Sequence, residues 1–347
     1  MNNPSLLIIY TGGTIGMVSD PQTGVLAPAN FKELYRYIPS LSAFKMNLDT
    51  ISFDPVIDSS DMNPDFWITL AGIIEENYDR YNGFVVLHGS DTMAYTASAL
   101  SFMLENLAKP VILTGSQLPL GMPRTDGREN FITAVDIAAA CINNKPIIAE
   151  VAIYFEYRLY KGNRTTKLHA EDFEAFYSGN YPVLAEAGVH IRYNHNAINT
   201  PIEQHSLHVH KKLDNNIAIL KLFPGISQDA VEAVFNINRL KGVILETFGT
   251  GNAPTDKWFL DILRDAIKKE IIIFNVTQCK AGSVEAGRYK TSEALREMGV
   301  VSGYDITTES AIAKMMYLFG KEQDHKKIKK MLQIPLQGEM TVASVVK

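Results

Sequence analysis

The chain has 347 residues, of which 46% are hydrophobic and 20% charged, a composition typical of a globular protein with about two domains. Its net charge of −5 gives no electrostatic basis for binding nucleic acid or an anionic membrane. No apolar run approaches the roughly 20 residues of a membrane-spanning helix, and the N-terminus lacks the basic start of a signal peptide. We therefore expect a cytoplasmic protein, in which Cys141 and Cys279 are free thiols.

The N-terminal half alternates short apolar runs with segments of helical period. The expected strands are Leu6–Tyr10, Thr50–Ile57, Gly83–Leu87, Pro110–Thr114 and Pro146–Phe155, and the expected helices are Phe31–Ile38, Pro64–Tyr81, Asp91–Leu107 and Asp126–Asn143. Asn63 followed by Pro64 is a helix-start signal, and Asp91 is expected to cap the next helix. Alternation of this kind predicts a parallel sheet with helices on both faces.

A polar segment, residues 193–216, interrupts this pattern and is predicted to be a linker. A second series follows, with strands at Ile217–Phe223, Gly242–Glu246 and Ile271–Val276 and helices near 227–238, 256–268, 291–298, 308–319 and 324–332. The sequence therefore predicts an α/β protein of two doubly wound domains, residues 1–192 and 217–347. The larger, N-terminal one, with a parallel-type sheet, is expected to carry the active site.

Polar loops follow four of the N-terminal strands. They are Thr11-Gly12-Gly13-Thr14, Asp58-Ser59-Ser60-Asp61, His88-Gly89-Ser90-Asp91-Thr92 and Gly115-Ser116-Gln117. Ligands of open parallel sheets bind at the carboxyl ends of the strands, so these loops are expected to meet at one site. The set is too rich in hydroxyl groups for a mere packing edge.

The chemistry of the first loop stays open on spacing alone. Adjacent Gly12 and Gly13 do not match the dinucleotide fingerprint, and no Gly-Lys-Ser/Thr of a Walker loop is present. Three interpretations therefore remain: Thr14 is a nucleophile, the glycines form only a tight turn with Thr14 capping a helix, or the loop binds a nucleotide without a standard motif. Ser90 does not fit the serine-hydrolase elbow, because glycine does not stand two residues later.

Two further segments favour structural roles when taken alone. The cationic tract Arg158–Lys167 is typical of a solvated loop. His205, His208 and His210 lie in the polar linker with no cysteine or carboxylate cluster nearby in the sequence. We therefore expect no metal site and no cofactor.

Taken together, the motifs resemble those of the cytoplasmic (type I) bacterial L-asparaginases. The matching segments are TGGTIGM at 11–17, DSSDM at 58–62, HGSDTMAYTASALSFMLENL at 88–107, TGSQLPL at 114–120, GNRTTK at 162–167 and GNAP at 251–254. The resemblance runs from Leu6 to about Thr341 in the same order and spacing. TGGTIG together with HG[S/T]DT is highly specific to the asparaginase–glutaminase superfamily.

This resemblance implies hydrolysis of L-asparagine to L-aspartate and ammonia through a covalent acyl-enzyme. Thr14 matches the family's nucleophile, and Ser90, Asp91 and Lys167 match its hydroxyl–acid–lysine triad. Asp58, Ser59 and Ser60 match the loop that holds the α-amino and α-carboxylate groups of the substrate, and Asp91 also reaches the α-ammonium. The resemblance further implies a homotetramer built as a dimer of dimers.

Three positions depart from the family pattern. Ser90 replaces the usual threonine, and Val25 stands where many relatives carry a tyrosine that assists the nucleophile. Glu246 stands where members with a second, activating asparagine carry an arginine, so we expect no such anchor and instead an ion pair between Glu246 and a nearby cation.

Two other functions compete with asparagine hydrolysis. An ammonia-releasing subunit of a tRNA-dependent amidotransferase is expected to carry an extra N-terminal domain, whereas the first strand here begins by residue 6. A non-catalytic amino-acid sensor of the same fold is disfavoured by the presence together of Thr14, Asp91 and Lys167.

Overall fold

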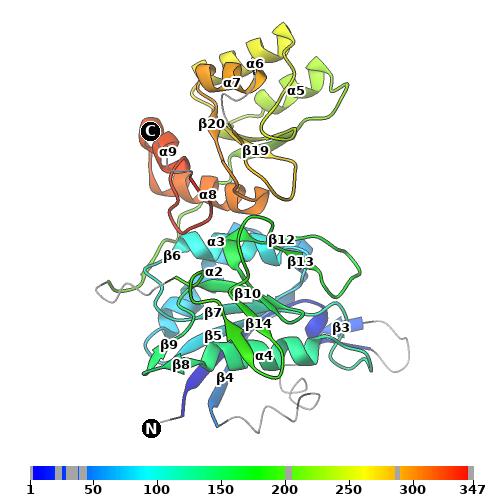
Figure 1. Cartoon of the computed structure of the whole chain (residues 1–347), viewed down its shortest axis with the longest axis vertical. Helices are drawn as coiled ribbons and strands as arrows, with labels where there is room; N and C mark the ends of the chain where they lie inside the picture. The colour runs from blue at the N-terminus through cyan, green and yellow to red at the C-terminus, as the bar shows by residue number, and fades with distance from the viewer. Residues whose placement is uncertain are drawn as a thin grey trace. The chain divides into compact units, whose positions relative to one another are not determined.

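The computed structural model describes residues 3–19, 26–28, 38, 45–199, 205–285 and 290–342. The chain divides into two compact units, residues 1–211 and 212–347, each with its own sheet (Figure 1). The expected helix at Phe31–Ile38 lies, except for Ile38, outside the described residues.

The first unit is built on an eight-stranded mixed sheet with the order β15-β14-β11-β10-β7-β5-β1-β4. Its parallel strands are β1 (Ser5–Gly12), β4 (Asn47–Ile57), β5 (Gly83–Leu87), β7 (Val111–Thr114) and β10 (Val151–Phe155). The strands β11 (Arg158–Lys161), β14 (Ala185–Ala187) and β15 (Ile191–Tyr193) extend it in antiparallel pairing. The α/β class and five parallel strands are confirmed, although the strand expected at Pro146–Phe155 begins only at Val151. The antiparallel extension was not predicted.

Shorter elements surround this sheet. Four two-stranded ribbons pair β2 (Met17–Ser19) with β3 (Leu26–Pro28), β6 (Leu104–Glu105) with β16 (His208–Val209), β8 (Cys141–Ile142) with β9 (Lys145–Pro146), and β12 (Thr166–Lys167) with β13 (Phe176–Tyr177). Single 3-10 turns are η1 (Thr14–Gly16), η3 (Ser59–Asp61) and η4 (Gly162–Arg164). The ribbon strands are too short for a periodic signal, so the sequence did not predict them.

Helices cover both faces of the sheet. Helices α2 (Pro64–Asn77) and α3 (Met93–Met103) lie on one face and α4 (Gly127–Ala139) on the other (Figure 1). The strands are consequently apolar on both faces, and residues 83–87 of β5 are all buried. Asn63 caps α2 through its side chain as predicted, but α3 begins only at Met93 with Thr92 as its cap residue, so the prediction that Asp91 caps it is wrong.

The parallel strands fix where a ligand site can form. In space, β1 lies between β4 and β5, whereas β4 comes directly before β5 in the order of the large-sheet strands. The chain thus moves from one side of β1 to the other, which makes the carboxyl ends of β1 and β5 a topological switch point. Thr14 follows the first of these strands and Ser90 the second.

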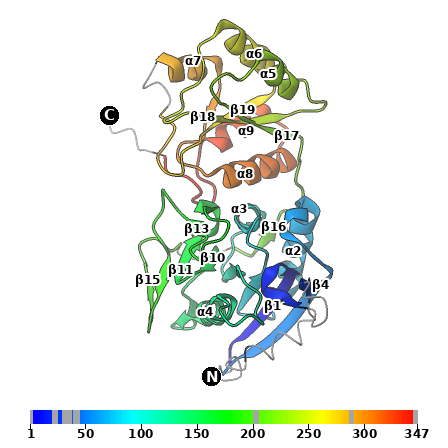
Figure 2. The same ribbon diagram turned by 90° about the vertical axis from the view of Figure 1, so that its right-hand side faces the viewer.

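The second unit is a smaller doubly wound domain. Its parallel sheet has the order β17 (Ile217–Lys221), β18 (Gly242–Thr247), β19 (Ile272–Thr277) and β20 (Val301–Ser302). Helices α5 (Gln228–Phe235), α6 (Lys257–Lys268) and α7 (Lys290–Met298) lie on one side of it, and α8 (Thr308–Lys321) and α9 (His325–Leu332) lie on the other (Figure 2). The predicted helices and strands of this half are confirmed, with small shifts at their ends.

Both cysteines are free and exposed, as expected. None of the helices in the described part of the chain has the length and apolar character that a bilayer crossing requires.

A buried ion pair joins α8 to the C-terminal segment of the second unit. Lys314 on α8 and Glu339 are both 0% exposed, with 2.6 Å between Nζ and Oε1. The ammonium group also donates to the carbonyls of Leu332 (3.1 Å) and Ile334 (2.7 Å). Burial lowers the pKa of Lys314, and the nearby carboxylate of Glu339 opposes this shift. The pair therefore fastens the C-terminal segment to α8.

We expect Lys314→Met to lower the free energy of unfolding by about 3–5 kcal/mol, because it leaves the Glu339 carboxylate buried without a counter-ion. Urea denaturation measures this loss. Lys326→Met, the same change at an exposed position of α9, is the control and should stay within about 0.5 kcal/mol of wild type. Equal stability of the two variants would contradict a structural role for the pair.

Candidate active site

Three loops come into close contact at the switch point. A Cβ atom on Gly13 would lie 2.4 Å from the backbone nitrogen of Gly89, and one on Gly89 would lie 2.5 Å from the Ser59 hydroxyl oxygen. Gly13 also has a φ of +88°, which favours glycine. The loops after β1, β4 and β5 therefore converge as predicted, and side chains at these two glycines would push them apart.

Thr14 is held at this junction by the turn it begins. It is the first residue of η1 and is half-buried, while Ile15 beside it is fully buried. The backbone N–H of Gly16 donates to the Gly13 carbonyl at 3.2 Å. Gly13 is the cap residue of this turn, so the alternative in which Thr14 serves as a helix cap is wrong.

A polar cluster lies on the adjoining loop after β5. The Lys167 ammonium donates to the Ser90 hydroxyl oxygen at 2.9 Å and to Asp91 Oδ1 at 2.5 Å. The Lys167 side chain is only 16% exposed, whereas that of Asp91 is 68% exposed. The structure therefore brings together the three residues Ser90, Asp91 and Lys167, and leaves the Asp91 carboxylate accessible to a ligand.

Gln117 is a member of this cluster to which the sequence assigned no role. The Ser90 hydroxyl donates to Gln117 Oε1 at 3.2 Å, and Gln117 Nε2 donates to the carbonyls of Ala170 (3.1 Å) and Asp172 (2.9 Å). Because the two carbonyls fix the amide orientation, Oε1 faces Ser90 as an acceptor. The Asp126 carboxylate in turn accepts from the backbone N–H of Gln117.

The predicted substrate-binding loop is a single 3-10 turn. Asp58 Oδ1 accepts from the backbone N–H of Ser60 at 2.9 Å and from the Ser60 hydroxyl at 2.8 Å, and these bonds lower the pKa of Asp58. Ser59 is buried, and its carbonyl accepts from the Thr92 hydroxyl at 2.7 Å. The loop is therefore tied to the start of α3, with the exposed Asp58 ionised at neutral pH.

A buried histidine holds the backbone of the Ser90 loop through hydrogen bonds. His88 is 0% exposed, with Nε2 2.9 Å from the Thr96 hydroxyl and Nδ1 2.7 Å from the Gly89 carbonyl. Trp67 Nε1 donates to the same Thr96 oxygen at 3.0 Å. Because the Gly89 carbonyl can only accept, Nδ1 carries the proton and donates to it, and Nε2 accepts from the Thr96 hydroxyl. This chain of hydrogen bonds orients the peptide that precedes Ser90.

The cationic tract is not a solvated loop, contrary to the prediction from the tract alone. Lys161 is 2% exposed, with its ammonium 2.5 Å from Glu150 Oε2, and the guanidinium of buried Arg164 lies 5.1 Å from the Tyr181 ring centroid. Buried cations of this kind need partners, and these lie outside the tract, so the tract by itself does not reveal them. They anchor the segment that carries Lys167.

Two further positions singled out in the sequence remain. Val25 lies outside the described residues. Glu246, on β18 of the second unit, forms an ion pair with Lys221 (3.1 Å) and accepts from the Thr308 hydroxyl at 2.6 Å. The expected ion pair of Glu246 with a nearby cation is confirmed.

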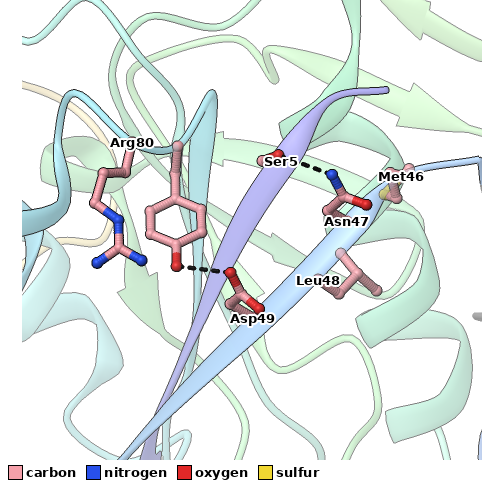
Figure 3. Close-up of a pocket in the computed structure, with 7 residues that line it drawn as sticks. Ser5, Met46, Asn47, Leu48, Asp49 and Arg80 are labelled. Atoms are coloured by element: carbon pink, nitrogen blue, oxygen red, sulfur yellow. Dashed lines mark hydrogen bonds between the residues drawn. The ribbon is translucent and has the colours of Figure 1, made fainter. Parts of the chain in front are cut away.

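A pocket of the first unit, shown in Figure 3, lies at the amino ends of β1 and β4. The Tyr81 hydroxyl donates to Asp49 Oδ2 at 2.8 Å there, and the Asn47 amide donates to Ser5 Oγ at 3.3 Å. Thr14 and Ser90 follow the carboxyl ends of the strands, at the opposite end of the sheet, so the pocket takes no part in the candidate site.

Family models match nearly the whole chain. The model for "Asparaginase, N-terminal" matches residues 5–199, and that for "Glutaminase/Asparaginase C-terminal domain" matches residues 216–332. The chain belongs to the asparaginase family. The resemblance seen in its motifs is thereby confirmed.

Relatives within the asparaginase family differ in their activities. The chain is 45% identical to L-asparaginase 1 of Escherichia coli (strain K12), a match covering 98% of this chain and 99% of that protein. The crystal structure of L-asparaginase I from Vibrio cholerae matches with a TM-score of 0.87 and 41% identity, over 98% of this chain and 100% of that one. One component of the glutamyl-tRNA(Gln) amidotransferase of Pyrococcus abyssi is 30% identical, over 97% of this chain and 77% of that protein.

The environment of His88 predicts a pH-dependent stability. Burial lowers its pKa from 6.5 to about 4, so between these values the unfolded chain binds the proton and the folded chain does not. The contribution is fully present above about pH 6.5 and is lost as the pH falls toward 4. Urea denaturation of wild type at pH 7 and pH 4.5 should show a loss of about 2–3 kcal/mol from this group.

Substitution of the imidazole isolates this effect from other titrating groups. His88→Gln should lose about 2–3 kcal/mol less stability than wild type over the same pH interval. His190→Gln, at an exposed position, is the control and should behave as wild type does. Identical pH dependence in all three proteins would show that His88 is not kept neutral by the fold.

Proposed function

We propose that this protein hydrolyses L-asparagine to L-aspartate and ammonia, with Thr14 as the nucleophile. The observation that carries the proposal is the junction of the Thr14 turn with the Ser90 loop, where Gly13 and Gly89 are in backbone contact. Similarity to L-asparaginase 1 of E. coli over nearly the full length of both chains supports the choice of substrate.

The proposed reaction divides amide hydrolysis into two steps. The Thr14 hydroxyl attacks the side-chain amide carbon, and its proton passes to the Lys167 amine through Ser90 or a water molecule. Backbone N–H groups near Gly13 and Ser90 stabilise the oxyanion, and ammonia leaves after protonation. Water then attacks the aspartyl ester by the same route and frees Thr14.

Substrate binding exchanges the partners of Asp91. In the structure the Asp91 carboxylate forms an ion pair with the Lys167 ammonium. We infer that the α-ammonium of asparagine contacts the exposed Asp91 carboxylate together with Asp58, while the α-carboxylate binds at the turn that contains Ser59 and Ser60. The α-ammonium then competes with the Lys167 ammonium for the Asp91 carboxylate, so the Lys167–Asp91 ion pair is weaker when substrate is bound.

Release of ammonia to a tRNA-dependent partner is the weaker alternative, because the amidotransferase relative is less similar and is matched over less of its length. A non-catalytic sensor would not need a lysine beside Ser90.

The assembly we propose is a cytoplasmic homotetramer, a dimer of dimers, which needs no cofactor.

Thr14→Ala should reduce kcat for asparagine by at least about 10³-fold, because the variant lacks the attacking hydroxyl. Lys167→Met should be comparably damaging, since it removes the base. Ammonia release under saturating asparagine measures both. Thr69→Ala, which deletes a hydroxyl on exposed α2 surface, is the control and should match wild type. More than a tenth of wild-type activity in Thr14→Ala would refute the acyl-enzyme.

Asparagine kinetics are expected to be near-hyperbolic. Lys221 and Thr308, which surround position 246, already bind the Glu246 carboxylate, and that carboxylate repels a second one. Cooperativity requires that a second, activating asparagine bind one conformational state of the enzyme more tightly than another. Without an anchor for its carboxylate at position 246, we expect no such difference in affinity. Initial rates over a wide asparagine range should give a Hill coefficient near one at several enzyme concentrations. A coefficient of roughly 1.5 or more would contradict the prediction.

A further inference from the structure

Three metal-ligating side chains lie together on the β6–β16 ribbon, away from the candidate active site. Glu105, His208 and His210 each offer one donor atom, and these atoms lie within 4.8 Å of one another. Glu105 is directly opposite His208 in the antiparallel pair. Opposite residues share a face of a ribbon, as do residues two apart on one strand, so all three project from the same face.

We propose that Glu105, His208 and His210 bind a divalent transition-metal ion of the zinc class. Imidazole nitrogen and carboxylate oxygen are common zinc ligands, and three protein ligands leave a fourth tetrahedral position for water. Tetrahedral ligands at about 2.0–2.2 Å from the ion lie about 3.4 Å apart. Side-chain rotations that shorten the present separations by about 1.4 Å or less therefore complete the site.

The backbone around these ligands is already ordered. The N–H of His210 donates to the Met103 carbonyl at 2.8 Å, and the Asn106 amide donates to the Ser206 carbonyl at 3.4 Å. Lys211 forms an ion pair with Glu75 on α2, with 2.5 Å between Nζ and Oε2. Since the segment is fixed on both sides of His208, metal binding carries little entropic cost for ordering the chain.

Sequence patterns alone favoured no metal at this place. The three histidines of the linker had no cysteine or carboxylate cluster nearby in the sequence, and the fold supplies a carboxylate from a position 103 residues before His208. Glu105 lies two residues after the end of α3, whose first residue lies three positions after Ser90. The 11-residue helix separates the cluster from Ser90 by about 16 Å, so the ion would fasten the end of α3 rather than contact substrate.

Zinc titration of the full-length protein tests the proposal. After treatment with EDTA and removal of the chelator, calorimetric titration with ZnCl₂ at about pH 7.5 should show one ion bound per chain. His208→Ala and Glu105→Gln should each weaken binding at least about tenfold, and the zinc-dependent rise in Tm should shrink in parallel.

His205→Ala is the matched control, because it removes an exposed histidine of the same segment that is not part of the cluster. It should bind zinc as wild type does. Absence of one-to-one binding by wild type would overturn the proposal. So would unchanged binding in His208→Ala and Glu105→Gln, or an equal loss in His205→Ala. None of these readouts depends on asparagine turnover.

Discussion

The site depends on a backbone contact that leaves no room for a side chain. Gly13 and Gly89 follow adjacent parallel strands, and a Cβ atom on either would collide with the other loop or with Ser59. The contact sets the spacing between the Thr14 turn and the Ser90 loop. The topology of the sheet determines where this loop contact lies, because only at a switch point do the loops after neighbouring strands run in different directions.

The fold was largely predictable because the parallel strands are buried on both faces and the helices have clear periodicity. Gly83–Leu87 is predicted and observed with identical bounds. The antiparallel strands β11, β14 and β15 escaped prediction, since three or four residues give too little pattern. Asp91 was expected to cap α3 because aspartate is a common cap residue, but the helix begins two residues later and the Asp91 carboxylate pairs with Lys167, the residue with which the motif resemblance had grouped it.

The residues that support the site were harder to find than those proposed to act in it. Motifs name Thr14 and Lys167, whereas Gln117 and His88 act through hydrogen bonds whose partners lie up to 55 residues away. Charge in the tract 158–167 suggested solvent exposure, yet Lys161 is buried against Glu150. A sequence shows that a cation is present but not which distant carboxylate lets it be buried.

The direction of the Ser90 hydrogen bond has a consequence for proton movement. The hydroxyl proton lies on the side of Gln117, while the oxygen accepts from Lys167. A relay through Ser90 toward the lysine must therefore begin with rotation of that hydroxyl away from the amide, a motion of one hydrogen atom about the Cβ–Oγ bond. In the reaction that we propose, the strength of the hydrogen bond between the Ser90 hydroxyl and the Gln117 carbonyl oxygen therefore contributes to the barrier for proton transfer.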